Sequence, residues 1–248
     1  VIQRHPGYQF ISSESLVALQ PDVILGMGGY AAGPGGLAGW LLRCPLVIHE
    51  QNAAAGMTNQ ALSLLARRRL QAFPGAIRKA EVVGNPVRPE FAALPVPAQR
   101  YGDRSGALRL LVLGGSLGAK ALNERLPQAV ARLPESKRPE IWHQGGRTVD
   151  VAEAAYRELA VTARVQAFID DVAQAYAWAD LVVCRAGAMT VAELAAAGCP
   201  ALLVPFPYAV DDHQTRNAQY LVAAGAAELI QERELDVATL AQRLEALL

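Results

Sequence analysis

The segment that most constrains the fold is Leu181–Phe206, in which two apolar runs flank a glycine turn and an alanine-rich stretch. The first run predicts a strand that ends at Cys184 and breaks at Gly187. A helix is expected from about Thr190 to Gly198, because glycine tolerates the left-handed conformation that commonly ends a helix. This succession of strand, glycine loop, helix and strand is typical of a parallel α/β unit.

The turn before this helix aims backbone N–H groups and the positive end of the helix dipole beyond the strand, where a phosphate binds favourably. Thr190 and Glu193 are spaced as Thr-x-x-Glu, which predicts a capping box at the helix start. In the alternative interpretation, Glu193 lies on the first turn and accepts hydrogen bonds from the ribose hydroxyls of a nucleotide. The two roles do not exclude each other.

Composition narrows the class of protein. The 248 residues include 23 Lys or Arg and 23 Asp or Glu, so the basic surplus expected of a nucleic-acid-binding protein is missing. Cys44, Cys184 and Cys199 lie in apolar contexts and are expected to be reduced core thiols of a cytosolic protein. No apolar run reaches the roughly 18–20 residues of a membrane span, and no secretory signal is visible.

The first part of the chain predicts an incomplete α/β region, after a short helix start at Ser12–Val17. Strands are expected at the following ranges: Val23–Leu25, Pro45–His49, Leu70–Ala72 and Glu81–Val83. Helices follow the first two strands. Prolines and glycines then collect in residues 89–106 with little periodicity, which favours a linker, so we expect one domain over 1–92 and another over 93–248.

The second part predicts a regular α/β succession, in which helices separate six expected strands. These strands are Leu108–Leu113, Ile141–His143, Val165–Ile169, Leu181–Cys184, Ala201–Val204 and Ala227–Ile230. Six strands alternating with helices indicate a Rossmann-like domain of the doubly wound kind.

Two glycine motifs have more than one interpretation. Gly26-x-Gly28-x-x-Ala31, with Glu50 at a later strand end, fits the dinucleotide-binding fingerprint loosely, because further glycines follow at once. Such a glycine-rich stretch also favours close backbone approach to a ligand or a facing domain. Gly114-Gly-Ser116-Leu-Gly matches a nucleophile elbow, for which Asp180 and His213 would complete a hydrolase triad. The same turn can instead hold a phosphate, which we favour because an eight-stranded hydrolase sheet is not predicted.

Polar residues follow two further strands. His49-Glu-Gln-Asn52 ends one strand and Asp211-Asp-His-Gln214 follows another, and ligands bind outside the carboxyl ends of strands in open α/β sheets. The His and Asp residues of the second group are contiguous and too few for a convincing metal site. Arg88, near the expected boundary, could reach across an interdomain cleft or be an ordinary exposed arginine.

Taken together, these motifs resemble those of one family, the MurG-type UDP-N-acetylglucosamine transferases of peptidoglycan synthesis. The segments that carry the resemblance, in family order, are Asp22–Gly36, His49–Asn52, Val83–Arg88, Gly114–Ala119, Phe168–Asp171, Cys184–Glu193 and Asp211–Ala218. The resemblance implies an α/β fold of the GT-B type, with two Rossmann-like domains whose parallel sheets face a cleft. It also implies an inverting enzyme that needs no metal or other cofactor.

The same resemblance implies the substrates and the location. The donor would be UDP-N-acetylglucosamine (UDP-GlcNAc), and the acceptor would be lipid I, the undecaprenyl-linked precursor that glycosylation converts into lipid II for cell-wall biogenesis, cell shape and division. The protein would be peripheral, on the cytoplasmic side of the bacterial inner membrane. Trp40-Leu41-Leu42-Arg43 has the mixture of residues favoured at a headgroup boundary, although Trp40 and Leu41 could equally be core residues of a helix.

Site residues carry over by position in the motifs. Asn52 and Gln214 would contact the sugar, Arg88 and Ser116 the nucleotide and its phosphates, and the backbone of Ile169 the uracil. Around the nucleotide would lie Ala188, Met189, Thr190, Val191, Ala192 and Glu193, with Glu193 on the ribose. The family's opening strand and histidine-bearing glycine loop have no match in residues 1–20, and its closing helices have none after Leu248. We therefore expect a chain truncated at both ends, with the catalytic residue unassigned and a UDP-sugar-binding remnant as the alternative to an active transferase.

Overall fold

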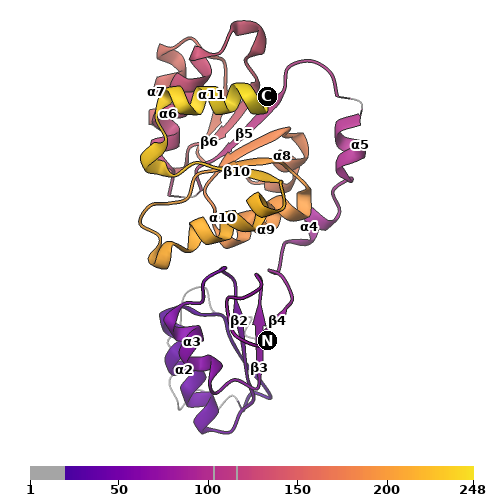
Figure 1. Cartoon of the computed structure of the whole chain (residues 1–248), viewed down its shortest axis with the longest axis vertical. Coiled ribbons are helices and arrows are strands. Elements are labelled where there is room, and N and C mark those ends of the chain that lie inside the picture. The colour runs from indigo at the N-terminus through magenta and orange to yellow at the C-terminus, as the bar shows by residue number, and fades with distance from the viewer. Residues whose placement is uncertain (1–19, 103, 116) are drawn as a thin grey trace. The chain divides into compact units, whose positions relative to one another are not determined.

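A computed structural model describes residues 20–102, 104–115 and 117–248. The helix start expected at Ser12–Val17 lies outside these residues. The chain divides into two compact units, Val1–Asn85 and Pro86–Leu248, each built on a parallel sheet (Figure 1). The expected α/β class is therefore confirmed.

The first unit contains a four-stranded sheet whose strands follow one another in chain order. These strands are β1 (Ile24–Gly26), β2 (Leu46–Glu50), β3 (Arg68–Gln71) and β4 (Glu81–Val82). Two helices, α2 (Gly29–Leu41) and α3 (Met57–Ser63), pack together beside the sheet (Figure 1). Leu46, Ile48 and Leu62 form the centre of the small core between the helices and the sheet.

The glycines of α2 allow its backbone to pack closely on neighbouring side chains. A β-carbon on Gly36 would lie 2.8 Å from Leu62 Cδ1, and one on Gly39 would overlap Ile24 Cδ1. The close approach expected of this glycine-rich stretch is therefore made, at these two positions, to α3 and β1 of the same unit.

The second unit contains a six-stranded parallel sheet with the order β10-β9-β8-β5-β6-β7. Its strands are β5 (Arg109–Leu113), β6 (Glu140–Gln144), β7 (Arg164–Gln166), β8 (Leu181–Cys184), β9 (Ala201–Leu203) and β10 (Ala227–Leu229). This is the doubly wound order expected from the sequence, and it reverses between β5 and β8.

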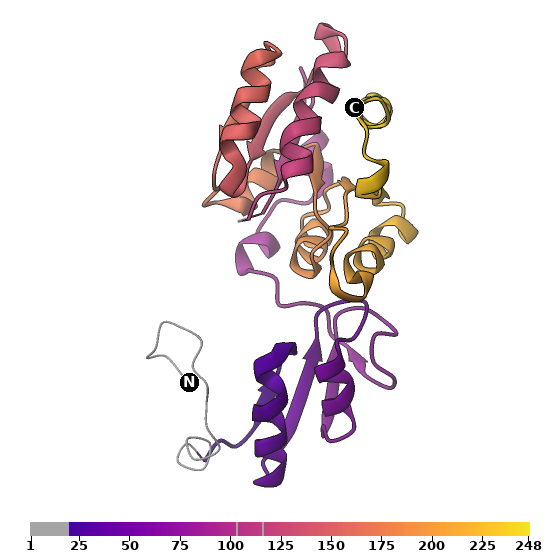
Figure 2. The same ribbon diagram turned by 90° about the vertical axis from the view of Figure 1, so that its left-hand side faces the viewer.

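Helices cover both faces of this sheet (Figures 1 and 2). One group packs through mutual contacts of α6 (Lys120–Arg132), α7 (Val149–Glu158) and α11 (Val237–Leu247). The other comprises α8 (Val172–Trp178), α9 (Ala188–Ala197) and α10 (His213–Ala223). Short 3₁₀ turns interrupt the connections at Glu135–Lys137 (η1), Gly146–Thr148 (η2), Val210–Asp212 (η3) and Glu232–Glu234 (η4). The main core lies between the sheet and the first helix group.

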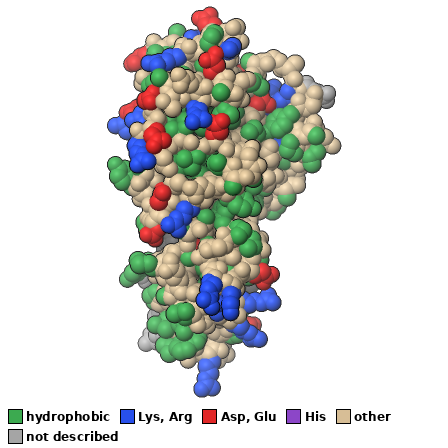
Figure 3. All heavy atoms as spheres, viewed as in Figure 1, with side chains coloured by type: hydrophobic (Ala, Val, Ile, Leu, Met, Phe, Trp, Pro, Cys, Tyr) green, Lys and Arg blue, Asp and Glu red, His purple; other side chains and the backbone are tan. Residues whose placement is uncertain are grey.

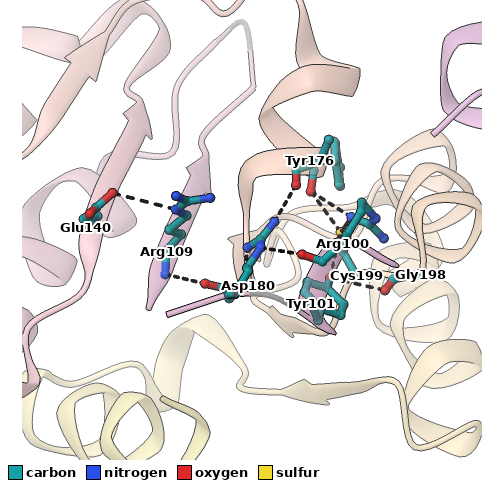
Figure 4. Close-up of polar contacts among 10 residues, drawn as sticks. Arg100, Tyr101, Arg109, Glu140, Tyr176, Asp180, Gly198 and Cys199 are labelled. Carbon is teal, nitrogen blue, oxygen red and sulfur yellow. Dashed lines mark hydrogen bonds and ion pairs between the residues drawn. The ribbon is translucent and has the colours of Figure 1, made fainter. Parts of the chain in front are cut away.

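The segment expected to be a linker instead forms two short helices, α4 (Pro89–Ala92) and α5 (Pro97–Gly102). Arg100 of α5 donates hydrogen bonds to the carbonyls of Ala197 and Tyr176, and Tyr101 faces Gly198 and Cys199 (Figure 4). A guanidinium at these positions stabilises the negative ends of α8 and α9.

Residues on either side of α5 also contact the rest of the second unit. Arg104 forms an ion pair with Asp180, and Phe91 of α4 packs edge-on against Tyr176 with ring centroids 5.2 Å apart. Because residues 86–102 pack on α8 and α9, the compact units divide after Asn85, several residues before the boundary expected at 92/93.

Candidate functional site

The order reversal of the second sheet brings two loops side by side. β5 and β8 are paired, with Leu113 opposite Cys184, so the loops that start at Gly114 and at Arg185 leave the sheet from neighbouring carboxyl ends. Doubly wound sheets bind ligands in the crevice at this point. Most of the site residues expected from the sequence lie on these two loops or on the helix that follows the second loop.

Helix α9 begins earlier than expected. Gly187 is the N-cap, with extended backbone angles and no side-chain cap, and the helix starts at Ala188. Thr190 is therefore inside the helix, Glu193 lies in its second turn, and the capping box predicted for this pair is wrong. The start of α9 lies beyond the end of β8, where the positive end of the helix dipole favours an anion.

Glu193 pairs with Arg88, the residue that precedes α4. Arg88 Nη2 lies 3.1 Å from Glu193 Oε1, and the two side chains are 49% and 14% exposed. Burial raises the pKa of Glu193, and the hydrogen bond and charge of Arg88 act against that rise. The Arg88 guanidinium also lies over the ring of Phe91, 5.2 Å from its centroid. Two residues predicted separately to contact a nucleotide are thus brought together.

Gln214 connects two loops at the same edge of the sheet. Its side-chain oxygen accepts hydrogen bonds from the backbone N–H groups of Ala186, at 3.2 Å, and Phe206, at 2.9 Å. The amide NH₂ group of Gln214 is left as the part that can donate to a ligand. Asp211 and Asp212, shortly before Gln214 in the chain, both have left-handed φ angles, of 53° and 49°.

Ile169 and Ser116 complete the set expected in the second unit. Ile169, whose backbone is expected to contact the base, is a buried residue, only 3% exposed. Ser116 lies outside the described residues. Its neighbours Gly115 and Gly118 both have left-handed φ angles, 74° and 81°, which favour glycine over other residues.

In the first unit, the polar residues after β2 form a scaffold around Glu50, which is only 3% exposed. The Glu50 carboxylate accepts hydrogen bonds from the backbone and side chain of Asn52, from the Gly56 N–H group and from the Asn59 side chain. The acidic residue of the dinucleotide fingerprint is therefore engaged by its own loop, which argues against a ribose contact there. Asn52 is held in place by these same bonds.

The hydrolase triad is wrong. Asp180 lies at the amino end of β8, where it binds Arg104 and the Arg109 N–H group, whereas Gly114 and Gly115 follow the carboxyl end of β5. The predicted acid therefore lies at the other end of the strands from the loop that starts at Gly114. In the described part of the chain, no three His, Cys, Asp or Glu side chains gather closely enough to hold a metal ion.

A second glycine loop escaped the sequence reasoning. Gly145 and Gly146 follow β6, and the Gly114 N–H group donates to Gln144 O at 3.0 Å. A β-carbon on Gly118 would lie 2.6 Å from Thr148 Oγ1, so the loops after β5 and β6 are in close contact. The paired glycines directly after a predicted strand were the available signal.

Both units of the chain match a known family of enzymes. Residues 109–248 match the glycosyltransferase family 28 C-terminal domain, and residues 8–71 match the N-terminal domain of the same family. The chain is 58% identical to a UDP-N-acetylglucosamine–N-acetylmuramyl-(pentapeptide) pyrophosphoryl-undecaprenol N-acetylglucosamine transferase of Nitrosococcus oceani, covering 95% of the chain and 67% of that protein. The corresponding transferase of Marinobacter nauticus is 55% identical, covering 92% of the chain and 64% of that protein.

Solved structures extend the likeness. The crystal structure of Acinetobacter baumannii MurG is 43% identical, with a TM-score of 0.86 over 95% of this chain and 67% of that one. A spinosyn rhamnosyltransferase complexed with thymidine diphosphate, 20% identical with a TM-score of 0.58, shares the fold. The chain thus has the GT-B fold and spans about two thirds of the length of these relatives.

Proposed function

Because the chain belongs to glycosyltransferase family 28, we propose that it is the UDP-GlcNAc-binding part of an inverting N-acetylglucosaminyltransferase. This enzyme would glycosylate lipid I to form lipid II in peptidoglycan synthesis. The observation that carries the proposal is the position of Glu193. Its mostly buried carboxylate lies in the second turn of α9, the helix that follows the order reversal of the second sheet. The names of the relatives at 55–58% identity supply the reaction.

The proposed contacts divide between the parts of the donor. Glu193 accepts hydrogen bonds from the ribose, the backbone of Ile169 binds the uracil, and Arg88 and Ser116 bind the phosphates. Asn52 and Gln214 contact the sugar. The nucleotide is surrounded by the start of α9, namely Ala188, Met189, Thr190, Val191 and Ala192.

In the proposed reaction, the acceptor hydroxyl oxygen bonds to the anomeric carbon while the bond from that carbon to the UDP oxygen breaks. The displacement inverts the configuration, and the hydroxyl proton passes to a base that we do not assign. UDP leaves with additional negative charge, which the N–H groups at the start of α9 and the Arg88 guanidinium would stabilise.

Calorimetry with UDP and ADP tests the nucleotide site. Backbone recognition of uracil leaves no place for a purine, so we expect UDP to bind and ADP to bind much more weakly. Equal binding of the two nucleotides would be incompatible with the proposed site.

The alternative is a catalytically impaired UDP-sugar-binding fragment of such an enzyme. A turnover assay with UDP-GlcNAc and a lipid I analogue separates the two possibilities. Product formation supports the transferase, whereas UDP binding without product supports the fragment.

We also propose a peripheral location on the cytoplasmic face of the inner membrane, where the lipid acceptor lies. No helix in the described ranges is long and apolar enough to cross a membrane. Trp40 and Leu41 are 45% and 67% exposed, which argues against a core role for them. In Figure 3, apolar and basic side chains both lie on the visible face of the first unit.

A further inference from the structure

A buried polar network lies behind the two glycine loops of the second unit. Asn123 of α6 and His143 of β6 are both fully buried, and His143 Nε2 lies 2.9 Å from Asn123 Oδ1. The Asn123 amide nitrogen lies within 2.9 Å of Gly145 O, Thr148 O and Thr148 Oγ1. Because this nitrogen donates to those oxygens, the Asn123 oxygen is an acceptor, and His143 Nε2 must carry the ring proton.

The other histidine nitrogen is satisfied by α7. His143 Nδ1 accepts a hydrogen bond from the Tyr156 hydroxyl at 3.1 Å, so both ring nitrogens are used by a neutral imidazole. Burial lowers the pKa of His143 to about 3, which keeps the ring in this form near neutral pH. The network therefore joins α6, β6 and α7, and the bonds that reach Gly145 and Thr148 all come from Asn123.

Those two residues support the loop after β5. Gly118 and Gly146 both have left-handed φ angles, 81° and 62°, and a β-carbon on Gly146 would lie 2.5 Å from Gly115 O. The two loops thus touch through their backbones, with no room for a side chain between them. A movement of Gly145–Thr148 would therefore displace Gly115 and Gly118, whose backbones it contacts.

We propose that Asn123, His143 and Thr148 are positioning residues for nucleotide binding. They fix the loop after β6, and this loop holds the backbones of Gly115 and Gly118 in the shape that receives the nucleotide's phosphates. The inference rests on the proposed function, which places the phosphates at that loop. Backbone N–H groups bind a phosphate only when they converge on it, so loop position decides affinity more than loop composition does.

The test measures UDP affinity by calorimetry, on the full chain, at a temperature where each variant is fully folded. Thr148→Val removes the hydroxyl at nearly constant volume, and His143→Leu removes both ring nitrogens. We expect each to weaken UDP binding about ten-fold, the effect of losing roughly one net hydrogen bond to the phosphates. His143→Gln keeps an N–H donor near the Nε2 position and should restore most of the affinity.

Tyr156→Phe is the matched control. It removes the hydroxyl at the other ring nitrogen and leaves the bonds from Asn123 to Gly145 and Thr148 in place. We expect this variant to melt at a lower temperature than the parent chain and to bind UDP with unchanged affinity. If the network were purely structural, Thr148→Val and His143→Leu would also melt at a lower temperature and bind UDP with unchanged affinity.

Parent-like UDP affinity in Thr148→Val and His143→Leu would overturn the inference. Affinity losses that follow the melting temperature in every variant, Tyr156→Phe included, would also overturn it. If His143→Leu does not fold, the UDP affinity of Thr148→Val decides alone, because Thr148 is partly exposed. Failure of the parent chain to bind UDP would overturn the proposed function and this inference with it, a result distinct from equal binding by parent and variants.

Discussion

The Arg88 guanidinium and the Glu193 carboxylate form an ion pair of 3.1 Å between residues 105 positions apart in the chain. Both belong to the second unit, where α4 packs on α9. Burial raises the pKa of Glu193, and Arg88 lowers it. Arg88 therefore favours the ionised form of Glu193, the form that accepts hydrogen bonds from ribose hydroxyls.

The Glu193 carboxylate should contribute strongly to UDP binding. Glu193→Ala removes the charge-assisted ribose bonds and should weaken UDP binding by about 1.5–3 kcal/mol. Glu193→Gln keeps the shape and one acceptor oxygen and should bind UDP with intermediate affinity. Isothermal calorimetry measures both effects. Since Glu193 caps no helix end, UDP affinity equal to that of the parent in both variants would leave it without its proposed role.

Removing Arg88 should make UDP binding more sensitive to acid. Without the guanidinium, the pKa of Glu193 should rise further, because burial then acts unopposed. The carboxylate is then lost at a higher pH, so UDP affinity in Arg88→Ala should begin to fall at a higher pH than in the parent chain. Calorimetry between pH 5 and pH 8 would measure this. Arg88→Lys retains the charge and serves as the control; the same pH midpoint in all three proteins would contradict the prediction.

His143 should make the stability of the fold depend on pH. Its pKa is about 3 in the folded chain, below its ordinary value of 6.5, so the unfolded chain binds the additional proton as pH falls from 6.5 towards 3. The stability associated with neutral His143 is present above pH 6.5 and is lost progressively below it. Between pH 7 and pH 5 this amounts to about 2 kcal/mol of unfolding free energy.

Urea unfolding of the parent chain and of His143→Gln, at pH 7 and at pH 5, isolates this contribution. Glutamine does not titrate, so the variant should lose less stability between the two values. Equal losses in parent and variant would show that other groups carry the pH dependence.

The sequence predicted the strands and glycine loops well because both are local signals. The apolar run ending at Cys184 and the break at Gly187 were sufficient to indicate a strand and a turn at the candidate site. The start of α9 was missed because Ala188 and Met189 are good helix formers that give no boundary signal. Gly187 caps the helix through its backbone conformation, which the sequence does not reveal.

Non-local pairings could not be predicted from spacing. Arg88 and Glu193 meet because α4 packs on α9, and Arg100 and Arg104 lie in a segment whose prolines favoured a linker. Asn123 and His143 belong to a helix and a strand that are ordinary in sequence, and only the paired sheet and helices bring them together. In each case the sequence gives the residue, and tertiary packing gives its partner.

Glycine at position 39 should help α2 to pack on β1. Gly39→Ala would overlap Ile24 Cδ1, so Ile24 must leave its preferred rotamer at a cost of about 0.5–1.5 kcal/mol, which offsets the up to ~1 kcal/mol that alanine contributes in a helix. Gly35→Ala is the matched control, because a β-carbon there meets nothing within 4 Å. Gly35→Ala should be neutral or slightly stabilising in urea unfolding. Equal effects of the two substitutions would show that helix propensity outweighs packing.

The exposed end of α2 should bind anionic membranes weakly. Trp40 and Leu41 line a hollow that also includes Arg43 and Arg67, so apolar and cationic groups meet there. An interfacial aromatic and a leucine enter the headgroup boundary, while arginines attract anionic lipid.

Co-sedimentation with vesicles containing anionic lipid should show weak partition of the parent chain, because stable anchoring usually requires a second signal. The double substitution Trp40→Ser/Leu41→Ser should reduce that partition, whereas Tyr208→Ser, at an exposed aromatic of the second unit, should leave it unchanged. Equal sedimentation of the parent and a folded double variant would exclude Trp40 and Leu41 from the membrane contact.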